Sequence, residues 1–180
     1  MRIITGLFRS KQILLPSYFQ DRPTTDMAKE SLFNILSNVV NFSTINFLDL
    51  FSGTGSISYE MASRGCRNIT CVDINRKYCD FIKKTFNGMF PNNSPARIIN
   101  ADALKFIENT PLNFDLIFAD PPYDMPGVDK IPEMILNNSG FKQDTLLIVE
   151  HSVKTRFTDL TYMKDQRHYG KVNFSFFSKA

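Results

Sequence analysis

Hydrophobic and polar positions divide the chain into a short N-terminal part and a longer part in which strands and helices alternate. Residues 2–16 alternate apolar and polar side chains around Gly6 and end at a proline, which predicts a short hairpin or extended arm. A helix is expected over 27–36, where Thr25 or Asp26 can cap its first turn. Its apolar face would consist of Met27, Leu32, Phe33, Ile35 and Leu36.

From residue 45 onward, apolar runs typical of strands alternate with segments of helical pattern. The expected strands cover 45–51, 68–72, 97–100, 114–119 and 146–150. The expected helices cover 57–63, 77–86, 102–107 and 131–136. Strands of this kind are buried on both faces, as in a parallel sheet covered by helices. Two β-rich runs, 161–163 and 172–177 with 166–171 between them, predict an antiparallel hairpin at the sheet edge.

Composition and charge alone exclude few classes of function. The 180 residues suit one domain, and the net charge of +3 is concentrated toward the two ends of the chain. A polyanion could bind across these ends, although solubility is the simpler interpretation. The three cysteines, Cys66, Cys71 and Cys79, form no CxxC pair, so neither a disulfide framework nor a metal site is expected. Without a signal peptide or membrane helix in the sequence, we expect a cytoplasmic protein.

Four acids stand at the ends of predicted strands. In an open α/β sheet, ligands bind beyond the carboxyl ends of the strands. For any single acid, capping of the next helix is an equally good explanation. The repetition favours a ligand site, and the four acids are Asp49, Asp73, Asp102 and Asp120.

The first three acids and a glycine turn indicate an adenosyl ligand. Gly53 and Gly55 allow a ligand to approach the backbone of a strand-to-helix turn closely. An acid at the position of Asp73 typically accepts hydrogen bonds from ribose hydroxyls, and Asp102 could meet the amine of an adenine. S-adenosylmethionine fits this pattern. The cofactor-binding residues we expect are Asp49, Phe51, Gly53, Gly55, Asp73, Ile74, Asp102 and Ala103.

The sharpest motif is Asp120-Pro121-Pro122-Tyr123, directly after an apolar strand. The prolines stiffen the loop and remove backbone donors. Asp120 and the Pro121 carbonyl can both accept hydrogen bonds from one amino group, and Tyr123 offers a face on which a flipped base can stack. The alternative is a turn that merely ends the strand. We interpret all four residues as the catalytic loop of a methyltransferase that acts on an exocyclic amine.

Further segments of the chain carry a resemblance to one family. They are Arg2-Ile3-Ile4-Thr5-Gly6, Leu14-Leu15-Pro16, Arg22-Pro23-Thr24-Thr25-Asp26, Glu30, Leu32-Phe33-Asn34, Leu36, the loop 48–55, the strand and loop 114–123, and Arg167, Tyr169 and Gly170. With them the sequence resembles the RsmD family of 16S rRNA (guanine-N2)-methyltransferases over nearly its whole length. Lys29 departs from the expected arginine, and Lys171-Val172-Asn173 departs from the acid and small residues common after the Tyr-Gly pair.

The resemblance implies a Rossmann-like class I methyltransferase fold with a mostly parallel sheet, helices on both faces and a C-terminal antiparallel hairpin. It implies an N-terminal arm and helix over 1–40 that contacts RNA or forms a lid, and a cofactor-binding domain over 41–180. Arg22, Thr24 and Arg167 are then the expected substrate-binding residues. The implied partner is 16S rRNA in a partly assembled small ribosomal subunit, and we expect a monomer without membrane association.

Two other functions fit parts of the sequence. An N6-adenine DNA methyltransferase would carry the same Asp-Pro-Pro-Tyr loop, but such enzymes usually have a target-recognition insert for which this chain has little room. A catalytically silent RNA-binding assembly module is the second alternative, and the intact acids Asp49, Asp102 and Asp120 speak against it. Among the single histidines and aromatic residues, His151 is expected to be a surface or packing residue rather than part of the active site. Tyr18 and Phe19 could belong to the core or stack on a base, and we expect the core.

Overall fold

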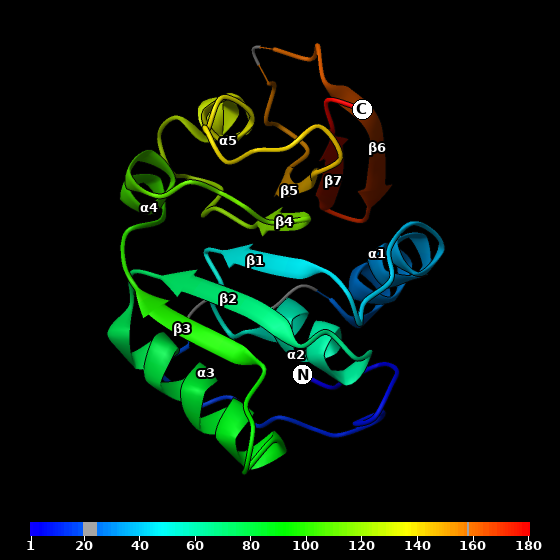
Figure 1. Cartoon of the computed structure of the whole chain (residues 1–180), viewed down its shortest axis with the longest axis vertical. Helices are drawn as coiled ribbons and strands as arrows, with labels where there is room; N and C mark the ends of the chain where they lie inside the picture. Colours follow the sequence, from blue (N-terminus) through cyan, green and yellow to red (C-terminus); the bar gives the residue numbers. More distant parts are fainter. Residues whose placement is uncertain (20–24, 158) are drawn as a thin grey trace.

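The computed structural model describes residues 1–19, 25–157 and 159–180, and it has a seven-stranded sheet at its centre (Figure 1). The strands are β1 (Asn46–Leu50), β2 (Asn68–Asp73), β3 (Ala96–Asn100), β4 (Leu116–Ala119), β5 (Leu146–Ser152), β6 (Met163–Tyr169) and β7 (Val172–Phe177). The helices are α1 (Asp26–Val39), α2 (Ser56–Ser63), α3 (Arg76–Met89), α4 (Ala103–Asn109) and α5 (Ile131–Leu136), with a short 3-10 turn, η1 (Val128–Lys130).

The strand order is β3-β2-β1-β4-β5-β7-β6. The first five strands in this order pair in parallel, and β7 and β6 join as an antiparallel hairpin beside β5. The order reverses direction between β1 and β4, which is the switch point where ligands of such sheets bind. The α/β class, the parallel sheet and the C-terminal hairpin at the edge are therefore confirmed.

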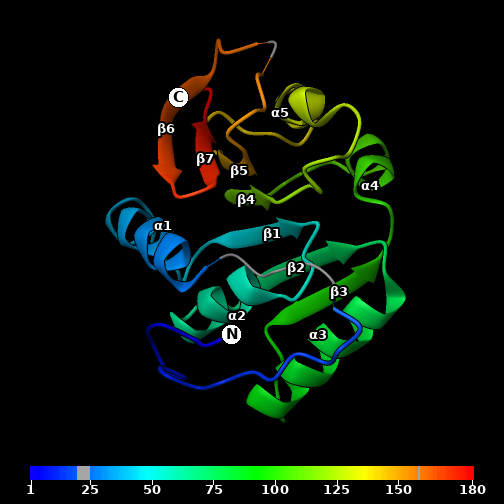
Figure 2. The same ribbon diagram turned by 180° about the vertical axis from the view of Figure 1, so that it is seen from behind.

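Two hydrophobic cores lie on opposite faces of the sheet, because successive strand side chains point to opposite sides. Phe47 and Phe118 pack with α1, α2 and α3 on one face, whereas Leu48 and Ile117 pack with α4 and α5 on the other. Figure 2 shows the helices of the two layers on either side of the sheet. Burial of the central strands on both faces is thus confirmed, while the edge strand β3 is only partly buried.

The N-terminal residues form an extended arm with a single antiparallel bridge, Arg2 to Gln12, and no named strand. The arm runs beside α2 and α3 (Figures 1 and 2). At Gly6, φ is +87°, and a Cβ atom there would lie 2.0 Å from the carbonyl oxygen of Ser63. Only glycine therefore allows the arm to approach α2 this closely.

Buried polar groups of α1 and α2 attach the arm. Glu60 accepts hydrogen bonds from the backbone N–H groups of Ile4 and Thr5, at 2.7 and 3.0 Å. The Lys29 amine donates to the carbonyl oxygen of Arg2 at 2.6 Å. Lys29 is 1% exposed, so this departure from the family pattern lies in the attachment of the arm and not on a surface that could meet RNA.

Two expected elements were placed wrongly. Met27 was assigned to the apolar face of α1, but it is 65% exposed, and the buried positions nearby are Ala28 and Lys29. The first strand of the hairpin covers 163–169, so most of 166–171 is strand and only Gly170 and Lys171 form the turn. The reason is that β6 lies at the sheet edge with exposed polar side chains, and pairing with β7 holds it without a hydrophobic pattern.

All three cysteines are free and buried. Over the described ranges of the chain, no helix has the length and apolar character needed to cross a membrane.

Candidate active site

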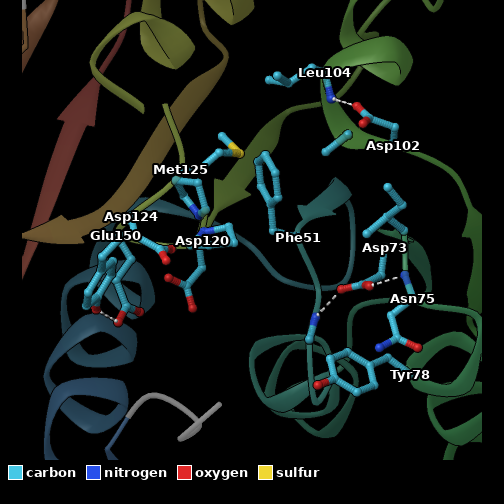
Figure 3. A pocket seen from close by; sticks show the side chains of 16 residues that line it. Phe51, Asp73, Asn75, Tyr78, Asp102, Leu104, Asp120, Asp124, Met125 and Glu150 are labelled. Carbon is cyan, nitrogen blue, oxygen red and sulfur yellow. Dashed lines mark hydrogen bonds between the residues drawn. The ribbon is translucent and has the colours of Figure 1, made fainter. Parts of the chain in front are cut away.

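A cavity of about 610 Å³ opens at the carboxyl ends of the parallel strands (Figure 3). Residues from the ends of β1, β2, β4 and β5 line it, namely Phe51, Asp73, Asp120 and Glu150. The start of α4 and the loop after β4 complete the wall. Parallel pairing explains this convergence, because it brings the ends of neighbouring strands to one edge of the sheet.

Asp73 organises one side of the cavity. Its two carboxylate oxygens accept hydrogen bonds from the backbone N–H groups of Gly53, at 2.8 Å, and Asn75, at 2.7 Å. These two contacts fix the orientation of the carboxyl group. Phe51 and Gly53 have φ values of +60° and +52°, which turn the backbone of the glycine loop toward Asp73.

The residues expected to surround an adenine lie beside Asp73. Asp102 caps α4, because its Oδ1 atom accepts from the N–H groups of Leu104 and Lys105 at 2.8 and 3.1 Å. Helix capping, the simpler explanation, is therefore real for Asp102, which also lines the cavity together with Ala103. Ile74 lines the cavity with a side chain that is 69% exposed and offers an apolar surface.

Two expected cofactor residues, Asp49 and Gly55, are not among those that line the cavity. Asp49 is 2% exposed and accepts a hydrogen bond from the Ser58 hydroxyl. Burial raises the pKa of Asp49 to about 7, and the Ser58 hydrogen bond opposes this rise. Gly55 is the N-cap of α2 with a φ of +77°, and an added Cβ would lie 2.8 Å from the Tyr59 ring. Direct contact of either residue with a cofactor stays a prediction.

The raised pKa of Asp49 predicts a pH dependence of stability. Between pH 3.8 and about 7, the folded protein retains a proton that the unfolded chain has released, so the free energy of unfolding should fall as pH rises through this range. Asp49→Asn should flatten the slope, because the amide cannot ionise. Urea denaturation at several pH values measures it. The exposed Asp144→Asn serves as control, and equal slopes for wild type and Asp49→Asn would contradict the assignment.

The Asp-Pro-Pro-Tyr loop forms the opposite side of the cavity, and all four residues line it. The backbone N–H of Asp120 donates to the Leu50 carbonyl at 3.2 Å, and that of Met125 donates to the Pro122 carbonyl at 2.9 Å. Tyr123 is 46% exposed, and its hydroxyl donates to Glu150 Oε1 at 3.0 Å. Burial and the nearby carboxylates Glu150 and Asp120 raise the pKa of Tyr123, so the phenol stays a donor.

Glu150 is the main site residue that the sequence reasoning missed. It lies within β5, and the register pairs Ala119 with Val149, so Asp120, which follows β4, lies beside Glu150. An acid at the end of an apolar strand was the available signal. His151, the next residue, is buried and bonded to the Ser175 hydroxyl at 2.8 Å, so of the two expected roles it has the packing one.

The expected substrate-binding residues are less well placed. Arg22 and Thr24 lie outside the described residues. Arg167 does not line the cavity; it lies on β6, where its Nε atom is 2.7 Å from Asp165 Oδ2. The register places Arg167 opposite Phe174, which in turn pairs with Glu150. Arg167 therefore lies at the same level along the strands as Glu150, which lines the cavity.

An aromatic stack stands at the rim of the cavity. Phe19 stacks on Tyr78, with ring centroids 4.3 Å apart, and Tyr18 stacks on Phe19 at 5.1 Å. Tyr78 lines the cavity, and Tyr18 is 39% exposed. The expectation that Tyr18 belongs to the core is therefore wrong, because the arm carries it across the outside of α3. In the part of the chain that the structure describes, no group of three acidic, histidine or cysteine side chains could hold a metal ion.

Comparison with known proteins gives concordant matches. The model of a protein family described as conserved hypothetical protein 95 matches residues 1–178. Ribosomal RNA small subunit methyltransferase D of Haemophilus influenzae is 31% identical over 153 residues, 83% of this chain and 78% of that protein. The protein of the same name from Escherichia coli K12 is 28% identical over 154 residues, 86% of this chain and 76% of that protein. The solved structure of the putative methyltransferase yhhF from Escherichia coli has a TM-score of 0.83 at 25% identity, covering 99% of this chain and 97% of that one.

Proposed function

Because this chain belongs to the RsmD family, we propose that it transfers a methyl group from S-adenosylmethionine to the 2-amino group of one guanine in 16S rRNA. The substrate is the small ribosomal subunit before its assembly is complete, and the reaction takes place in the cytoplasm. The relatives named as small subunit methyltransferases support the RNA substrate. The guanine and its 2-amino group are the finer part of the proposal.

One observation carries the proposal. A single cavity is lined both by Asp73, Ile74 and Asp102 and by the Asp120 to Tyr123 loop. The first group fits an adenosyl ligand, since Asp73 is oriented to accept from hydroxyls and Ile74 offers an apolar face. The second group fits an amino group and an aromatic base. A methyl donor and its acceptor can therefore meet in the same space.

The residues of the chain act by holding and orienting the acceptor. Asp120 and the Pro121 carbonyl accept hydrogen bonds from the amino group, so that its lone pair points toward the cofactor side of the cavity. When bound, S-adenosylmethionine supplies an electrophilic methyl group. Tyr123 stacks on the extruded base. Asp120 favours the positive charge that develops on the nitrogen, and the methylated nitrogen then releases one proton to solvent. Alignment of the two reactants supplies much of the rate acceleration.

The deciding experiment is to map rRNA methylation in a strain that lacks the gene. One methylguanine should disappear from 16S rRNA and return with the wild-type gene but not with an Asp120→Ala gene. Purified protein should methylate 30S particles from that strain and leave duplex DNA unmodified. Unchanged rRNA with methylation of DNA would favour an adenine DNA methyltransferase, and failure to bind S-adenosylmethionine in calorimetry would favour a silent assembly module.

A further inference from the structure

The acceptor side of the cavity is lined by several carboxyl groups. Asp120, Asp124 and Glu150 all belong to its wall, and Figure 3 shows their side chains beside one another. The β4–β5 register pairs Ala119 with Val149, which places Asp120 beside Glu150. Beside Asp120, which accepts from the amino group in the proposed mechanism, the cavity wall thus offers a second carboxyl group to a bound base.

Glu150 is almost entirely buried, with 3% of its surface exposed. Burying a carboxylate is costly unless hydrogen-bond donors surround it. The Tyr123 hydroxyl provides one donor to Oε1, at 3.0 Å. Glu150 also lines the cavity, so its carboxyl group borders the space in which a base would bind. A donor-bearing base in the cavity would therefore gain from the position of Glu150.

We propose that Glu150 determines base specificity by accepting the N1–H group of the target guanine, while Asp120 and the Pro121 carbonyl hold its 2-amino group. This inference rests on the proposed function and names the group that reads the base. Guanine presents N1–H and the 2-amino group next to each other on one edge, which matches two carboxylates on adjacent strands. A base with an unprotonated N1 would place a lone pair against Glu150.

Such a mismatch gives strong discrimination, because it leaves buried acceptors facing each other without a proton. The same arrangement rejects adenine, whose N1 is an acceptor. Glu150 thus combines attraction to guanine with repulsion of its competitors. The alternative role for Glu150 is to position the Tyr123 ring through the 3.0 Å hydrogen bond, without contacting the base.

Glu150→Gln separates the two roles. The glutamine retains an oxygen that accepts from Tyr123 and presents an amide N–H₂ in place of the second carboxylate oxygen. A positioning role would be preserved by this change, whereas recognition of N1–H would be lost. Tyr123→Phe is the complementary variant, because it removes the hydroxyl and keeps both the ring and the carboxylate.

The probe is 16S rRNA ligated from fragments and assembled into 30S particles. It carries guanine or 2-aminopurine at the nucleotide mapped in the deletion strain. Both bases have the 2-amino group, but N1 of 2-aminopurine is an acceptor. Wild type should favour guanine by about 100-fold in kcat/KM, and Glu150→Gln should reduce this ratio to below about 10-fold. Tyr123→Phe should keep the ratio of the wild type even where its rates fall.

Calorimetry with S-adenosylmethionine checks that Glu150→Gln is folded and retains its cofactor affinity. A wild-type guanine preference that persists in Glu150→Gln would overturn the inference and leave the proposed function standing. A wild-type protein that methylates neither RNA would instead overturn the proposed function. If Tyr123→Phe loses the preference as fully as Glu150→Gln does, Tyr123 rather than Glu150 reads the base, and the inference is wrong.

Discussion

Asp120→Ala is expected to lower the rate of methyl transfer about a thousandfold, because the loss of one preorganised acceptor at a reacting group has effects of this order. Asp120 follows β4 directly, and its backbone N–H is bonded to the Leu50 carbonyl, so the carboxylate is held by the central part of the sheet. Affinity for S-adenosylmethionine should change only a few-fold, since Asp73 and Ile74 are unaffected. Single-turnover transfer of a labelled methyl group measures the rate, and calorimetry measures the affinity.

Asp144→Ala is the matched control for this change. It removes the same charge at an exposed position outside the cavity and should leave both quantities at wild-type values. An Asp120→Ala protein with normal turnover would remove the catalytic loop from the mechanism. A protein that loses cofactor affinity as strongly as turnover would place Asp120 among the cofactor-binding residues instead.

Most of the fold could be predicted because burial dominates the central strands. β1, β4 and β5 are buried on both faces and mostly apolar, so their sequence pattern is readily recognised. The edge strand β6 was misplaced because pairing with β7, and not hydrophobicity, decides its extent. The N-terminal arm was recognised as extended, but its attachment by Glu60 and Lys29 depends on tertiary contacts that no local pattern encodes.

The residues of the candidate site could be predicted where acidic side chains stand at the ends of strands. Asp73, Asp102 and Asp120 were found because parallel strands bring their carboxyl ends to one edge of the sheet. The same rule suggested Asp49, but Asp49 lies within β1 and not after it, so its carboxyl group is buried next to Ser58. Glu150 was missed because its pairing with Tyr123 joins residues that are distant in the sequence.

The attachment of the arm predicts the second large effect. Glu60 is fully buried and binds three groups: the N–H groups of Ile4 and Thr5, and the Arg64 guanidinium at 2.9 Å. Glu60→Ala leaves two backbone donors and one mostly buried cation without this partner. Breaking a buried charged pair in this way costs about 3–5 kcal/mol, so the free energy of unfolding should fall by that amount in urea denaturation.

Glu30→Ala on the exposed side of α1 is the control, and its effect should stay within about 0.5 kcal/mol. Phe19, near the end of the arm, stacks on Tyr78 at the rim of the cavity, so detachment of the arm should also lower activity. If the arm detaches locally, Glu60→Ala will lose little global stability, but the amides of residues 3–13 will exchange hydrogen faster than those of β1. Wild-type stability together with wild-type exchange in the arm would contradict the role of Glu60, because the buried carboxylate would then hold nothing in place.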